Sequence, residues 1–301
     1  MFKVEVPDNF TKDSMGSLID KVITPDLYPS DQEIKFDFCK LKFIEPAGVT
    51  ILRNLFKWLM ARGVKVIITT PQLMANNKDN SLKYLDDSMF FKLFLGRTLF
   101  SNSRVRNTTL ELQDVTYEDS YQWLTFKFIP WLAREMNLQQ SSLSTIQMCF
   151  GEIFNNIKDH ANENIGCIFA QHYPKNHQVK ISISDFGVGI PNTIRNVDPY
   201  LNDTQALEKA IQEGYSSKST PRNRGAGLHT LIQNVVINYD GEVHIHSFRG
   251  ILTCKQNNLN ELWIQSKQGS SIYPGTFIEV ILDTRNFEDD YINEEEFEWD
   301  L

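Results

Sequence analysis

The pattern that most constrains the fold lies between residues 151 and 228, where three short motifs follow one another in a fixed order. A helical pattern carries Glu152-Ile-Phe-Asn-Asn-Ile-Lys-Asp-His160, and a strand pattern then ends in Asp185-Phe-Gly-Val-Gly-Ile190. A glycine-rich stretch, Gly225-Ala-Gly-Leu228, opens a second helical pattern that runs to Ile237. Helix, strand and helix patterns in close succession indicate an α/β fold.

The first motif places four polar side chains on one stripe of a helix predicted over residues 141–161. At about 100° per residue, these four positions fall within roughly a quarter-turn of one another. The stripe consists of Glu152, Asn156, Asp159 and His160. Oxygen ligands of this kind suit Mg²⁺, which prefers oxygen and keeps several waters. A solvated helix face is the alternative interpretation of the same stripe.

The second motif carries a carboxylate to the apolar face of a strand. Residues 179–185 alternate strictly, and Asp185 has the parity of Val179, Ile181 and Ile183. A buried carboxylate needs hydrogen-bond donors. The amino group of an adenine base would be such a donor, and Gly187 and Gly189 would let the backbone approach a flat base closely. The alternative is that Asp185 only caps the turn that follows the strand.

The third motif has the composition of an anion site. Backbone amides at a glycine-rich helix start attract anions, and a basic cluster lies just upstream. The residues involved are Lys218, Arg222, Arg224, Gly225, Ala226, Gly227 and Leu228. Neither a P-loop nor a dinucleotide fingerprint is present, because there is no GxxxxGK[ST] and Thr230 stands where the last glycine would be.

The first hundred residues alternate between strand and helix patterns. Strands are predicted at residues 2–6, 34–38 and 64–70, and helices at 13–23, 46–62 and 81–95. Proline at the start of the second helix and Gly63 just past its end are typical helix boundaries. The alternation predicts a small α/β sandwich.

Residues 36–49 and the helix and strand that follow resemble the STAS domain of anti-sigma-factor antagonists and lipid-transport accessory proteins. In that family a strand ends in an Asp-Ser-Ser/Ala-Gly turn whose serine can be phosphorylated. The turn reads Glu45-Pro-Ala-Gly48 in this chain, so the acceptor hydroxyl is missing and self-phosphorylation there is excluded. An ordinary α/β domain without this kinship is the alternative.

The three motifs together resemble the GHKL ATPase family, which includes type II topoisomerases, heat-shock chaperones, histidine kinases and mismatch-repair ATPases. Two further stretches match it, Tyr215-Ser-Ser-Lys218 before the glycine motif and Pro274-Gly-Thr276-Phe277 late in the chain. The resemblance implies a Bergerat α/β sandwich with a mixed sheet, and ATP and Mg²⁺ as cofactors. It implies Glu152 as the catalytic base and Asn156 as the Mg²⁺ ligand. The remaining nucleotide-binding positions would be Asp159, His160, Asp185, Gly187, Gly189, Ile190, Lys218, Arg224, Gly225, Ala226, Gly227, Leu228 and Thr276.

These resemblances predict a STAS-like domain at residues 1–112, a GHKL domain at 120–285 and an acidic tail at 286–301. The expected function is a regulatory Mg-ATPase in which residues 190–224, with a helix at 204–213, close over the nucleotide and control the docking of a protein partner. A serine/threonine protein kinase of the anti-sigma-factor type and a passive nucleotide sensor are the alternatives. A histidine kinase is disfavoured, because none of the six histidines lies in a phosphoacceptor setting.

Charge is concentrated at the C-terminus. Residues 287–301 hold eight acids and no Lys or Arg, and the other 30 acids of the chain balance its 30 bases. No basic surface for nucleic acid is therefore expected. No apolar run approaches the ~18 residues of a membrane span, and no signal pattern opens the chain, so we expect a cytoplasmic protein. A protein partner would bind the STAS-like domain or the tail, and the protein could also form a homodimer. His244 and His246 are expected at the surface, on one face of a strand.

Overall fold

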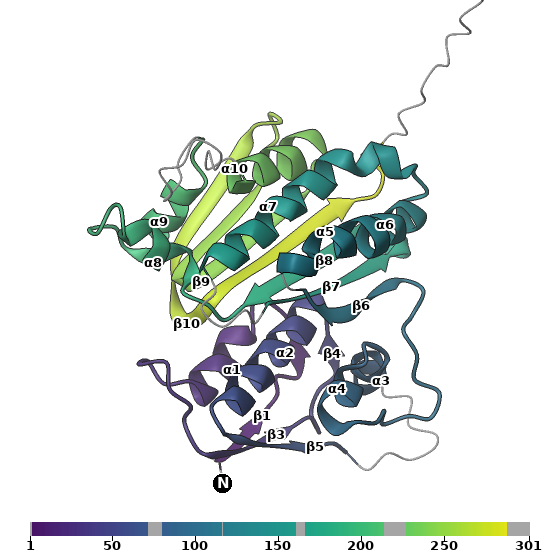
Figure 1. The fold of residues 1–301 in the computed structure, drawn as a ribbon, viewed down its shortest axis with the longest axis vertical. Helices are drawn as coiled ribbons and strands as arrows, with labels where there is room; N and C mark the ends of the chain where they lie inside the picture. The colour runs from purple at the N-terminus through teal and green to yellow at the C-terminus, as the bar shows by residue number, and fades with distance from the viewer. Residues whose placement is uncertain (1, 72–79, 116, 161–165, 214–226, 288–301) are drawn as a thin grey trace, which may run out of the picture.

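The computed structural model describes residues 2–71, 80–115, 117–160, 166–213 and 227–287 (Figure 1). The fold is α/β with both parallel and antiparallel sheets, which confirms the predicted class. None of the helices in these ranges is long and apolar enough to cross a membrane.

The N-terminal unit is built on a parallel sheet in the order β1-β3-β5, formed by Phe2–Glu5, Glu33–Asp37 and Lys65–Thr69. A second parallel pair joins β2 (Asn9–Phe10) to β4 (Phe43–Ile44). The helices of this unit are α1 (Met15–Val22), α2 (Pro46–Ala61), α3 (Asn80–Asp87) and α4 (Phe90–Leu95). All three predicted strands and the first two predicted helices are present, and the third predicted helix is split in two.

Helix α2 shows why the sequence folds in this way locally. Pro46 occupies its first turn, where a missing N–H is tolerated, and the chain leaves the helix through Gly63 at φ +74°. Thirteen of its sixteen residues are buried, so the helix is covered on nearly all sides. A helix that is buried on nearly all sides has to lie between two layers.

The C-terminal unit contains a five-stranded sheet in the order β6-β7-β8-β10-β9. Its strands are β6 (Thr109–Asp114), β7 (Gly166–Tyr173), β8 (Gln178–Asp185), β9 (Glu242–Gln256) and β10 (Leu262–Asp283). All neighbouring strands pair antiparallel, so the expectation of a mixed sheet is wrong for this unit. Strands β8 and β9 do run in the same direction, but β10 lies between them and pairs with both.

Helices cover one face of this sheet. They are α5 (Tyr117–Trp123), the π-helical η1 (Leu124–Phe128), α6 (Ile129–Met136), the 3₁₀ segment η2 (Gln140–Leu143), α7 (Ser144–His160), α10 (Gly227–Ile232) and the π-helical η4 (Gln233–Asn238). A short 3₁₀ segment, η3 (Pro174–Asn176), joins β7 to β8, and α8 (Gly189–Arg195) and α9 (Asp203–Ala210) follow β8. Together, η2 and α7 correspond to the helix predicted over residues 141–161, which therefore begins with a 3₁₀ turn.

The opposite face of the sheet packs against the N-terminal unit (Figure 1). Phe169, Tyr273 and Phe277 of the sheet, and Phe186 directly after β8, belong to the same apolar core as the residues of α1 and α2. The whole molecule therefore has an apolar core on each face of one central sheet. Strand β6 belongs to this sheet, so the boundary expected at residue 112 falls within a strand.

Polar contacts cross the same interface. Thr50 and Ser182 hydroxyls lie 2.9 Å apart, Asn54 donates to Ser184 at 2.6 Å, and Lys12 forms an ion pair with the buried Glu279. Buried polar groups without partners would be costly here.

The expectation that His244 and His246 lie at the surface is wrong, although they do share one strand face. They are 8% and 5% exposed, because the N-terminal unit covers that face of β9. Burial lowers the pKa of His244 to about 3 and that of His246 to about 4, so both rings are neutral at physiological pH.

Candidate functional site

Four residues form one row across the large sheet, at the point where β7 begins and β8 ends. Gly166 of β7 is the register partner of Asp185 of β8. Asp185 is in turn the partner of Thr276 of β10, and Thr276 is the partner of Ser247 of β9. The three motifs and the late threonine are far apart in sequence. The row brings Asp185 and Thr276 together, and it adds Ser247, which sequence reasoning missed.

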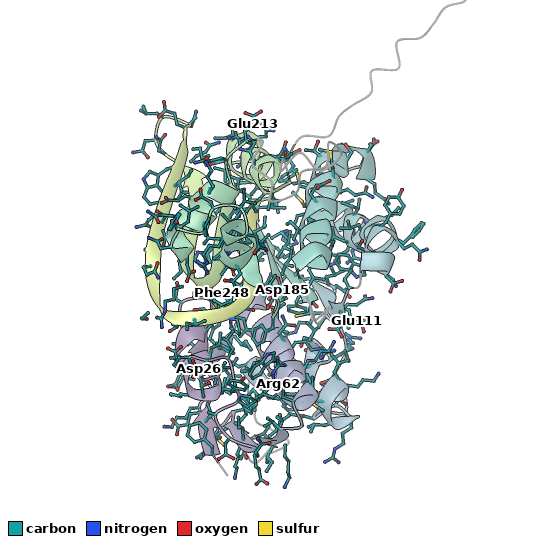
Figure 2. All side chains as sticks on the ribbon, turned by 60° about the vertical axis from the view of Figure 1, so that its left-hand side comes forward. Asp26, Arg62, Glu111, Asp185, Glu213 and Phe248 are labelled. Atoms are coloured by element: carbon teal, nitrogen blue, oxygen red, sulfur yellow. The ribbon has the colours of Figure 1, made fainter. Side chains whose placement is uncertain are left out.

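Asp185 is buried, as the alternation of its strand predicts, and it is 6% exposed (Figure 2). Its Oδ1 accepts the backbone N–H of Gly187 at 2.9 Å, and the carboxylate also accepts the backbone N–H of Thr276. Burial raises the pKa of this carboxyl to about 7, and the two N–H donors offset only part of that shift. The carboxylate therefore caps the turn, yet it keeps capacity for further donors.

Two glycines let the backbone close tightly around this carboxylate. A Cβ on Gly275, at φ +119°, would lie 2.4 Å from the carbonyl oxygen of Asp185 and 2.6 Å from the nitrogen of Gly187. A Cβ on Gly189, at φ +73°, would lie 2.6 Å from the ring of Phe248. No other residue fits these positions without moving its neighbours. Gly189 opens α8, and Gly187 lies in the turn before it.

Ser247 holds this turn in place. Its hydroxyl donates to the carbonyl oxygen of Gly275 at 2.6 Å and accepts the backbone N–H of Ile190 at 3.1 Å. It also lies 3.2 Å from the hydroxyl of Thr276. A lone serine in a strand gives no sequence signal for such a role.

Helix α7 brings the first motif to the same end of the sheet. It ends at His160, and six residues later Gly166 lies beside Asp185 in the sheet. Glu152 is exposed, while Ile153 and Phe154 enter the core, so the expected division of polar and apolar faces holds at these three positions. The backbone of α7 carries Asn156, Asp159 and His160, whose side chains lie outside the described part of the structure.

The segment after Asp185 contains the helices α8 and α9. The helix expected at 204–213 is present as α9, whose Leu207 is fully buried and whose Asp203 pairs with Arg195 of α8 at 2.7 Å. The predicted positions Lys218, Arg224, Gly225 and Ala226, together with Arg222, lie outside the described residues. Gly227 begins α10, and Leu228 is buried in the core between helices and sheet.

The N-terminal unit contacts the back of this site. Asn54 of α2 donates to Ser184, the residue before Asp185, at 2.6 Å. The ring of Phe186, the residue after it, packs edge-on against Trp58 of α2 at 6.4 Å. The backbone that presents Asp185 is thus held from the N-terminal unit on both sides, which local sequence patterns do not reveal.

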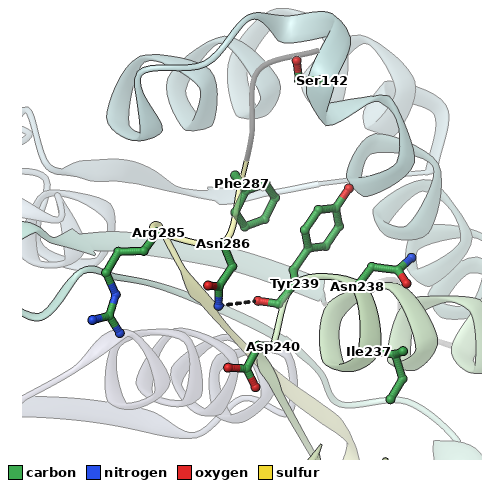
Figure 3. Close-up of a pocket in the computed structure, with 8 residues that line it drawn as sticks. All are labelled: Ser142, Ile237, Asn238, Tyr239, Asp240, Arg285, Asn286 and Phe287. Carbon is green, nitrogen blue, oxygen red and sulfur yellow. Dashed lines mark hydrogen bonds between the residues drawn. The ribbon is translucent and has the colours of Figure 1, made fainter. Parts of the chain in front are cut away.

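A separate pocket of about 550 Å³ lies at the other end of the sheet (Figure 3). Its lining residues are Ser142, Ile237, Asn238, Tyr239, Asp240, Arg285, Asn286 and Phe287. Along β10, Asp283 is seven residues from Thr276, a separation of roughly 23 Å at 3.3 Å per residue. This pocket is therefore distinct from the Asp185 site.

No protein-family model matches the chain. No curated protein matches it at a significant level either.

Proposed function

We propose that this protein is a GHKL-type regulatory ATPase that binds Mg-ATP at the Asp185 end of the large sheet. The observation that carries the proposal is the buried carboxylate of Asp185, set in a row with Thr276 and enclosed by glycines that exclude any side chain. A carboxylate buried at a cost and surrounded by tightly packed backbone is typical of a ligand site rather than of a stability element.

The residues present fit an adenine nucleotide. Asp185 would accept a hydrogen bond from the adenine amino group, and Thr276 would offer its hydroxyl beside it. Asn156 would hold Mg²⁺, and Glu152, which is exposed, would act as the base that takes a proton from the attacking oxygen. Bound Mg-ATP would supply a phosphoryl group that transfers to this oxygen.

The phosphate contacts of the proposal come from the start of α10. Backbone amides at Gly225, Ala226, Gly227 and Leu228, with Lys218 and Arg224, would cradle the phosphates. Asp159, His160 and Ile190 complete the proposed set. Closure of residues 190–224 over the nucleotide would then change how the protein docks a partner.

The N-terminal unit is proposed to be STAS-like and to transmit this change. Its turn Glu45-Pro-Ala-Gly48 cannot accept a phosphoryl group on a hydroxyl, since none of its four residues has one. Glu45 itself is 5% exposed and is paired with Lys180 of β8 at 2.9 Å. This observation favours an ATPase over a kinase acting on its own N-terminal unit. The faces of α1 and α2 packed on the sheet are occupied, so a partner would bind elsewhere on this unit.

Labelled ATP tests the proposal directly. Purified protein is incubated with γ-labelled ATP and Mg²⁺, alone and with lysate, and binding is titrated in parallel. Released phosphate supports the ATPase, a labelled protein band supports a kinase, and binding without turnover supports a sensor. Asp185→Asn should lose ATP binding, while Asp26→Asn, an exposed aspartate of the N-terminal unit, should not (Figure 2). Wild-type affinity in a folded Asp185→Asn variant would remove the adenine assignment.

A further inference from the structure

Three large apolar side chains are exposed on the helical layer. Tyr121 and Phe126 are each 71% exposed and Met148 is 56% exposed. They lie on α5, η1 and α7, and the latter two elements are joined by a hydrogen bond from Gln147 to Thr125 at 2.9 Å. We call Tyr121, Phe126 and Met148 the apolar helix patch. Large exposed apolar residues on neighbouring helices commonly mark an interaction surface.

The described chain ends close to this patch. Phe287 stacks on Tyr239 with ring centroids 4.1 Å apart, and it lines the same pocket as Ser142 (Figure 3). Met148 follows Ser142 by six residues, about 9 Å along a helix. Because a pocket of about 550 Å³ is roughly 8 Å across, the pocket and this helix length together place Met148 within roughly 20 Å of Phe287.

The fourteen residues beyond Phe287 have the length and chemistry to cover the patch. An extended chain advances about 3.3 Å per residue, so about six residues span the distance. Residues from about 294 onward then reach the patch, and these include Phe297 and Trp299. Lys127, which is exposed on η1 next to Phe126, is a countercharge for the acidic neighbours of these two aromatic residues.

We propose that residues 288–301 dock on the apolar helix patch of their own chain through Phe297 and Trp299. Aromatic burial against Phe126 and Met148 supplies most of the affinity, and the acidic side chains that flank Phe297 and Trp299 favour the side of Lys127. Tethering at Phe287 gives the segment a local concentration in about the millimolar range, so it outcompetes a free partner of equal affinity.

The test compares the full chain with a chain that ends at Phe287. Deletion should speed up hydrogen exchange several-fold in residues 120–128 and 145–151 and leave α9 unchanged. A synthetic peptide of residues 288–301 should restore protection to the shortened chain. Equal exchange in the two chains would overturn the proposal. Protection that disappears on dilution, together with a dimer in sedimentation, would assign the patch to a second copy and also overturn it.

Fluorescence gives an independent readout. The emission of Trp299 is obtained as the difference between the full chain and its Trp299→Phe variant, and it should be that of a shielded indole. Phe126→Ser or Met148→Ser should shift this emission to the red, whereas Tyr200→Ser, which alters a 95% exposed aromatic residue elsewhere, should not. Trp299 emission typical of an indole in water in the intact chain would refute docking.

Discussion

Replacing Asp185 by asparagine should stabilise the nucleotide-free protein at high pH. Burial raises the pKa of Asp185 from 3.8 to about 7. For an acid shifted upward, the folded state holds its proton more tightly than the unfolded state. The contribution of Asp185 to the free energy of unfolding is therefore fully present below about pH 4 and is lost as the pH rises towards 7. Asparagine stays neutral and does not carry this cost.

The size of the effect follows from the shift. About three pKa units at 1.36 kcal/mol each give at most about 4 kcal/mol above pH 7. Between about pH 5 and about pH 8, the free energy of unfolding of Asp185→Asn minus that of the wild type should grow by about 3 kcal/mol. Taking this difference cancels the pH-dependent contributions of other titrating groups, which both proteins share. One such group is the buried Glu279, because burial also raises its pKa.

Denaturant unfolding at several pH values measures the difference, and Asp26→Asn is the control that should follow the wild type. The same carboxylate links pH to ligand binding. ATP affinity of the wild type should weaken as the pH falls below about 7, since the protonated carboxyl is the poorer acceptor. A stability difference that does not change with pH would refute the assignment of a buried, proton-holding Asp185, whatever the binding result.

Three substitutions and one exchange measurement separate the roles of the proposed site. Glu152→Gln should lower ATP turnover by about two orders of magnitude or more with affinity preserved, whereas the exposed Glu111→Gln should leave both unchanged, as phosphate-release assays would show. Asn156→Ala should weaken ATP binding only when Mg²⁺ is present, and titrations with and without metal check this. Gly275→Ala, which forces a Cβ against the backbone of Asp185, should destabilise the fold by roughly 1–3 kcal/mol and reduce ATP affinity. Hydrogen exchange across residues 190–224 should slow when Mg-ATP binds, and exchange indifferent to the nucleotide would count against closure.

Local patterns account for the elements of the structure. Strand alternation predicted both the extent of β8 and the burial of Asp185, because successive side chains of a strand point to opposite faces. Proline and glycine marked the ends of α2, since each restricts or frees a backbone angle at its own position. These effects act within a few residues, so a single sequence contains them.

Tertiary packing decided what covers the second face of the large sheet. The sequence by itself determined that Ser182 and Ser184 share a face, but not that α2 would bury both through Thr50 and Asn54. The burial of His244 and His246 has the same origin, and so does the alignment of Ser247 with Asp185. Such contacts join residues up to 267 positions apart, as for Lys12 and Glu279, and their energy depends on how whole layers meet rather than on the residues near each side chain.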